Sequence, residues 1–134
     1  MSKRTGIVVP HLTVHLPEHR LAGQEPALTA ALTEAIVDVY GEWARDIVGI
    51  RLAGVPAGRL AKGGKAVDTS ASVVLGIRAG AFERPDTEQL TARLGAGLTD
   101  AVTGVLGEDM RAGTMVELVA SPPDRTFVGG VREG

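Results

Sequence analysis

The chain has 134 residues, a formal net charge of -2, 44% hydrophobic residues, 3% aromatic residues and no cysteine. This length supports one domain with a real core, and the lack of cysteine excludes disulfides, thiolate metal sites and a cysteine nucleophile. The near-neutral charge and scarce aromatic side chains argue against nucleic-acid binding, which needs clustered basic residues or stacking platforms. Because no apolar run has the length of a signal peptide or a membrane span, we expect a cytoplasmic protein without membrane or nucleic-acid partners.

The first half of the chain predicts a strand, a helix and a second strand, in that order. We expect residues 1–9 to be an N-terminal extension, and a strand to follow it, because Leu12, Val14 and Leu16 alternate with polar residues. After turn-like residues at 17–23, apolar residues recur at helical spacing and predict a helix that stops at Gly41. They are Leu28, Leu32, Ala35, Ile36 and Val39. A second strand then alternates through Val48, Ile50 and Leu52, and a loop closes on Gly63-Gly64.

The second half predicts the same elements again. Val73, Leu75 and Ile77 alternate as a strand does, and turn-like residues follow at 79–85. Helical spacing then links apolar residues up to Gly107, where we expect the helix to stop. They are Leu90, Leu94, Leu98, Ala101, Val102 and Val105. The last predicted strand alternates through Val116, Leu118 and Ala120, and its loop closes on Gly129-Gly130.

The two halves are copies of one unit. LTEAIVDVYGE at residues 32–42 and LTDAVTGVLGE at residues 98–108 share six of eleven positions, at an offset of 66 residues. The same offset relates Arg45 to Arg111, Pro56 to Pro122, Arg59 to Arg125 and the two Gly-Gly pairs. Several independent matches at one offset indicate an internal repeat. We therefore predict a single domain over residues 10–134, built from units at about 10–68 and 69–134.

Each unit is a β-α-β unit, whose long helical crossover makes its two strands parallel. Two such units predict an α+β fold, with a four-stranded sheet and two helices on one face. The opposite face of that sheet would be uncovered and fairly apolar, which predicts association with further copies of the chain.

These features together resemble the tautomerase superfamily. The resemblance rests on PHLTVHLPEHR, which begins at Pro10 and carries Arg20 ten residues later, on AI at 35–36 and on PAGRLAKGG at 56–64. The first half is similar to 4-oxalocrotonate tautomerase, and the fused length to the malonate semialdehyde decarboxylase and cis-3-chloroacrylic acid dehalogenase groups. The resemblance implies a tautomerase/MIF-like fold, a homotrimer whose neighbouring subunits complete each active site, and catalysis with no cofactor.

Pro10 is the catalytic residue that this resemblance implies. The family uses an N-terminal proline amine as general base, and an apolar pocket near arginines lowers the pKa of an α-amino group below its ordinary value of about 7.7–8.0. Here nine residues precede Pro10, and a proline nitrogen within a peptide bond is not basic. Three explanations stay open: translation that starts at Val9, cleavage between Val9 and Pro10, or a genuine extension that leaves the protein without this base.

Arginines are the substrate-binding residues that the resemblance implies. Arg20, Arg78 and Arg84 are expected to hold a substrate carboxylate, and Arg51 lies near a substrate-binding arginine of 4-oxalocrotonate tautomerase. We expect no hydrolytic dehalogenation, because the activating histidine of the dehalogenase falls on Ile36 or Val37. A metal site is not expected either, because His11 and His15 on one strand would lie about 13 Å apart.

We therefore predict a cofactor-independent isomerase that moves a proton on a small anionic keto or enol carboxylic acid. One alternative is a relative without the proline base, recruited to another isomerisation or a cyclisation in a biosynthetic pathway. In that case a histidine is a candidate base, and His11 lies nearest the relevant strand end. The other alternative is a non-catalytic, ligand-binding trimer, and fold alone does not choose between them.

Overall fold

The structure is a computed structural model that describes residues 10–132, so the predicted extension at 1–9 lies outside the described residues. The strands are β1 His11–Pro17, β2 Gly49–Val55, β3 Ala61–Lys62, β4 Lys65–Ala66, β5 Ala71–Arg78, β6 Thr114–Ser121, β7 Phe127–Val128 and β8 Val131–Arg132. The α-helices are α1 Glu18–Leu21, α2 Glu25–Tyr40 and α3 Thr87–Leu106. Within residues 10–132, four 3₁₀ helices lie at Glu42–Ala44, Ala79–Glu83, Glu108–Gly113 and Pro123–Arg125.

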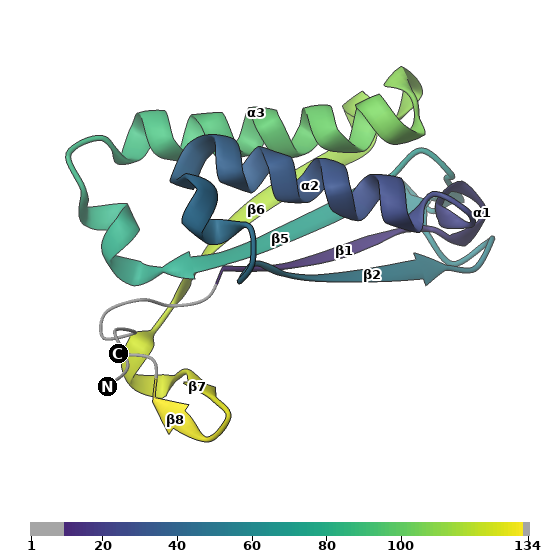
Figure 1. The fold of residues 1–134 in the computed structure, drawn as a ribbon. Coiled ribbons are helices and arrows are strands. Elements are labelled where there is room, and N and C mark those ends of the chain that lie inside the picture. The colour runs from purple at the N-terminus through teal and green to yellow at the C-terminus, as the bar shows by residue number, and fades with distance from the viewer. Residues whose placement is uncertain (1–9, 133–134) are drawn as a thin grey trace.

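Four strands form one mixed sheet in the order β2-β1-β5-β6. Each unit contributes a parallel pair, β1 with β2 and β5 with β6, and the antiparallel pairing of β1 with β5 joins the units. The two long helices, α2 and α3, lie side by side over one face of the sheet (Figure 1). The predicted α+β fold of two β-α-β units is confirmed.

The core lies between this sheet face and the two helices. Alternation decides which strand residues enter it, because successive side chains point to opposite faces of a sheet. The strand residues of the core are Leu12, Val14, Leu16, Val73, Leu75 and Ile77, and each is at most 2% exposed. From the helices, Leu28, Leu32, Ile36, Leu94 and Leu98 pack against them and are fully buried. Among the helices of residues 10–132, none combines the length and apolar character needed to cross a bilayer.

The repeat is visible in side-chain contacts as well as in topology. Arg45 bonds the carboxylates of Glu34 and Glu42, and Arg111, 66 residues later, bonds those of Asp100 and Glu108. Both long helices end before a glycine with positive φ, 107° at Gly41 and 117° at Gly107, as the sequence predicted. The β3-β4 and β7-β8 hairpins also correspond, and in each the two-residue turn is Gly-Gly.

Gly113, just before β6, offers a test of the packing between the segment that precedes β5 and the segment that precedes β6. A Cβ atom at this position would lie 2.2 Å from the backbone oxygen of Thr69, whereas a Cβ at Gly95 within α3 would meet nothing within 4 Å. We expect Gly113→Ala to lower the free energy of unfolding by about 1–3 kcal/mol through overpacking. Gly95→Ala should raise it by about 0.4–1 kcal/mol. Urea denaturation of both variants measures the difference, and equal effects would contradict the close approach at Gly113.

Candidate active site

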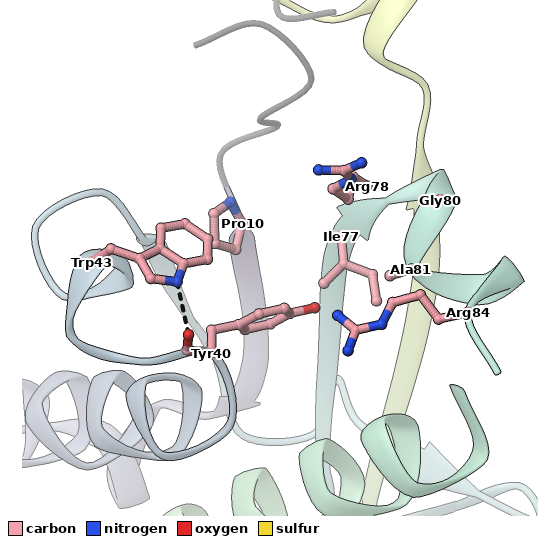
Figure 2. A pocket seen from close by; sticks show the side chains of 8 residues that line it. All are labelled: Pro10, Tyr40, Trp43, Ile77, Arg78, Gly80, Ala81 and Arg84. Atoms are coloured by element: carbon pink, nitrogen blue, oxygen red, sulfur yellow. Dashed lines mark hydrogen bonds between the residues drawn. The ribbon is translucent and has the colours of Figure 1, made fainter. Parts of the chain in front are cut away.

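A pocket forms where β1 begins and β5 ends. The antiparallel register places His11 opposite Gly76, so the start of β1 meets the last residues of β5. Pro10 is buried there, and its carbonyl oxygen accepts a hydrogen bond of 3.0 Å from the backbone N–H of Gly49. The pocket has a volume of about 480 Å³ and is lined by Pro10, Tyr40, Trp43, Ile77, Arg78, Gly80, Ala81 and Arg84 (Figure 2).

Two aromatic residues form one wall of this pocket. Tyr40 ends α2, the chain turns at Gly41, and the following 3₁₀ helix brings Trp43 back beside Tyr40. The indole Nε1 of Trp43 donates a hydrogen bond of 2.7 Å to the carbonyl oxygen of Tyr40. The two rings meet edge to face, with centroids 5.9 Å apart. They are the chain's only tyrosine and only tryptophan, so both residues of these types lie at one site.

The hydroxyl of Tyr40 is a hydrogen-bond donor without a protein acceptor in the described part of the chain. Its oxygen is buried, and no hydrogen bond from residues 10–132 reaches it. Burial raises the pKa of Tyr40, and the positive charges of Arg84 and Arg78 oppose that shift. The phenol is therefore neutral at neutral pH and can donate to a ligand atom.

Two arginines lie on the other side of the pocket: Arg78 ends β5, and Arg84 follows the 3₁₀ helix Ala79–Glu83 and directs its guanidinium toward Tyr40 (Figure 2). Arg84 donates to both carboxylate oxygens of Asp86, at 2.9 and 2.8 Å. These bonds raise the pKa of Arg84 and lower that of Asp86. Arg78 is exposed, and its guanidinium makes no hydrogen bond or ion pair with another residue of 10–132, so within this part of the chain the whole fork is open to an anion.

Of the five residues predicted for the site, the structure brings Pro10, Arg78 and Arg84 together. The others, Arg20 and Arg51, lie elsewhere in the chain. Arg51 lies on the edge strand β2 opposite Thr13, exposed on the uncovered face of the sheet.

Arg20 lies at the opposite end of the β1-β5 pair, where it donates to Asp109 Oδ1 at 2.6 Å and to the Leu106 carbonyl at 3.1 Å. Leu106 and Asp109 correspond through the repeat to Tyr40 and Trp43. In the second unit, the position equivalent to the aromatic wall therefore carries Leu106 and the ion pair of Asp109 with Arg20.

The fold of this chain is similar to that of several solved structures. No protein-family model and no curated protein sequence matches it. A fused 4-OT wild type asymmetric trimer is 26% identical in sequence, with a TM-score of 0.77. The match covers 92% of this chain and 95% of that chain. A fused 4-OT wild type symmetric trimer is 27% identical with a TM-score of 0.74, and the match covers 89% of this chain and 91% of that chain. Pt0534, inactivated by 2-oxo-3-pentynoate, shares the fold at 22% identity with a TM-score of 0.79. The match covers 92% of this chain and 95% of that chain.

Proposed function

We propose that this chain, which has the fold of the tautomerase superfamily, moves a proton on a small keto or enol carboxylic acid in the Pro10 pocket. The observation that carries the proposal is the meeting of Pro10 with Arg78 and Arg84 in one pocket. Fused 4-OT structures that match over 92% of this chain and 95% of their own chains support a tautomerase-like protein.

The proposed chemistry assigns separate tasks to the two sides of the pocket. The guanidinium of Arg78 binds the substrate carboxylate and thereby fixes the position of the neighbouring enol. The amine of Pro10 takes the proton of the enol hydroxyl, and the ammonium so formed returns a proton to the adjacent carbon, which yields the ketone. This cycle consumes no other reactant, but it requires a Pro10 nitrogen that is free of a peptide bond.

The decisive experiment compares the full chain with a form that begins at Pro10. Both are assayed for ketonisation of phenylenolpyruvate by the loss of enol absorbance, and intact mass verifies each N-terminus. The proposal predicts activity in the form that begins at Pro10 and a rate lower by about 10²–10⁴-fold in the full chain. Equal rates would contradict a role for the Pro10 amine, and binding without turnover in both forms would favour the ligand-binding alternative.

A trimer is part of the proposal, because the chain exposes apolar side chains that a neighbour could cover. In the β7-β8 hairpin, Phe127, Val128 and Val131 are 54%, 44% and 67% exposed, and the hairpin extends away from the sheet and helices (Figure 1). The fused 4-OT neighbours are trimers. Light scattering at micromolar concentration should give the mass of three 13.9 kDa chains. A stable monomer would contradict the assembly and any site shared between subunits.

A further inference from the structure

We propose that the Tyr40 hydroxyl and the Arg84 guanidinium form a subsite for the 2-oxo or enol oxygen of a 2-oxo carboxylate, while Arg78 holds the carboxylate. The ligand class rests on the proposed function, but the subsite is argued from the geometry of the pocket.

Tyr40 directs its hydroxyl into the pocket from the last turn of α2. Figure 2 shows the phenol ring extending beneath Pro10, with its oxygen toward Ile77 and Arg84. The oxygen is buried and has no hydrogen-bond partner among the described residues. Buried hydroxyls in proteins are almost always hydrogen-bonded, so a buried donor that points into a cavity indicates a place for a ligand acceptor.

The bonds already made by the arginines decide which ligand group lies beside Tyr40. Arg84 uses one N–H of Nε and one of Nη2 for Asp86, so three of its five N–H donors are left, but its charge is already paired with a carboxylate. The guanidinium of Arg78 makes no hydrogen bond or ion pair within residues 10–132 and can bind a carboxylate with two parallel bonds. A carboxylate therefore fits the unpaired Arg78 better than Arg84, and the single 2-oxo oxygen fits the pair of Tyr40 and Arg84.

This subsite stabilises the charge that appears during proton transfer. When the enol loses its proton, negative charge develops on the oxygen, and a neutral hydroxyl and a guanidinium directed at that oxygen lower the energy of the transition state. The raised pKa of Tyr40 keeps the hydroxyl protonated and able to donate. The hydrogen bond from Trp43 to the Tyr40 carbonyl and the packing of the two rings hold the phenol in place before a ligand arrives.

The test measures binding on the full chain, so it does not depend on turnover. Trp43 is the chain's only tryptophan and lines the pocket, so its fluorescence reports ligand binding directly. The probes are 2-oxobutanoate and butanoate, which differ by the 2-oxo oxygen. The unaltered chain should prefer 2-oxobutanoate by about 3–10-fold, the range of one net hydrogen bond. Tyr40→Phe should reduce this preference, because only Arg84 is then left to contact the 2-oxo oxygen, and should leave the affinity for butanoate unchanged.

Two further variants keep the result specific. Arg84→Ala should also reduce the preference for 2-oxobutanoate, whereas Arg78→Ala should weaken both ligands equally and preserve the ratio. The melting temperature of Tyr40→Phe should not fall, because that substitution removes a hydroxyl with no hydrogen-bond partner among residues 10–132. A purely structural role of Tyr40 would lower the melting temperature and leave the ratio of affinities intact.

The outcomes separate this inference from the proposed function. An unaltered chain without preference for 2-oxobutanoate, or a Tyr40→Phe variant that keeps the preference in full, would overturn the subsite even if the form that begins at Pro10 is an active isomerase. A reduced preference in Tyr40→Phe, together with no turnover in either form, would leave the subsite standing and overturn the isomerase.

Discussion

Release of the Pro10 nitrogen from its peptide bond is expected to raise the rate of phenylenolpyruvate ketonisation by about 10²–10⁴-fold over the full chain, the usual contribution of a positioned general base. An amide nitrogen cannot accept the enol proton, whereas a secondary amine in the same pocket can. The two forms share every residue that lines the pocket, so the comparison isolates the one bond that differs. Initial rates at equal protein concentration, each corrected for the spontaneous reaction, measure the effect.

The pH dependence of that rate has a definite sign. A free Pro10 amine acts as a base only after it has lost its proton, so the rate should rise with pH and level off above the pKa of the amine. Its surroundings are a buried position and two nearby guanidiniums, and both disfavour the charged form. The midpoint should therefore lie below the ordinary range of about 7.7–8.0. A full chain that shows the same midpoint would assign the transition to another group.

Pro10→Ala, made in the form that begins at residue 10, is the matched control for this prediction. It exchanges a secondary amine for a primary amine at the same position, so the rate should fall without reaching that of the full chain. If the alanine variant is as slow as the full chain, a free primary amine at this position is not sufficient, and the pocket requires the secondary amine of proline.

Strand alternation and the repeat made most of the fold predictable. Leu12 and Val14 had to face the helices because they are the apolar members of an alternating strand. Pairing of β1 with β5 then placed Pro10 opposite the end of β5, and so near Arg78. Alternation also implied the position of Arg51, because Ile50 and Leu52 point inward and the residue between them points to the uncovered face.

The contacts that sequence reasoning missed depend on single positions outside the strands. Arg20 matches the family pattern in spacing, but Asp109 bonds it, and nothing in periodicity pairs residues 89 positions apart. Tyr40 and Trp43 had one available signal, which is that the chain's only tyrosine and only tryptophan flank a predicted helix stop at Gly41. These side chains pack beside the start of β1, and that contact depends on the tertiary fold.

The repeat therefore places two equivalent positions in the fold, one after each long helix. At the first, Tyr40 and Trp43 line the pocket together with Arg78 and Arg84. At the second, Leu106 and Asp109 replace the aromatic pair, and the Asp109 carboxylate lowers the availability of Arg20 to any other anion. The two copies share one scaffold and differ at a few positions at the helix ends, and the pocket that contains Pro10 lies at the first copy.

Arg78→Ala is expected to weaken binding of butanoate to the full chain by about 10–100-fold, the scale of hydrogen bonds to a charged group. Arg78 lines the pocket, and its guanidinium makes no bond to another residue within 10–132. Its removal therefore takes away the group that binds the carboxylate and leaves no side chain of these residues without a partner. Arg84→Ala should cost less, because two of its donors already serve Asp86. Quenching of Trp43 fluorescence measures the affinity for butanoate of the unaltered chain, of Arg78→Ala and of Arg84→Ala.

Arg20→Ala is the control that decides between a local and a general effect of positive charge. It removes the same charge from the chain, but at the far end of the β1-β5 pair, where Arg20 bonds Asp109. Its affinity for butanoate should equal that of the unaltered chain, because the pocket around Pro10 keeps all its lining residues. If Arg20→Ala weakens binding as much as Arg78→Ala does, the carboxylate does not bind beside Pro10. The pairing of proline amine and arginine on which the proposed proton transfer depends would then be wrong.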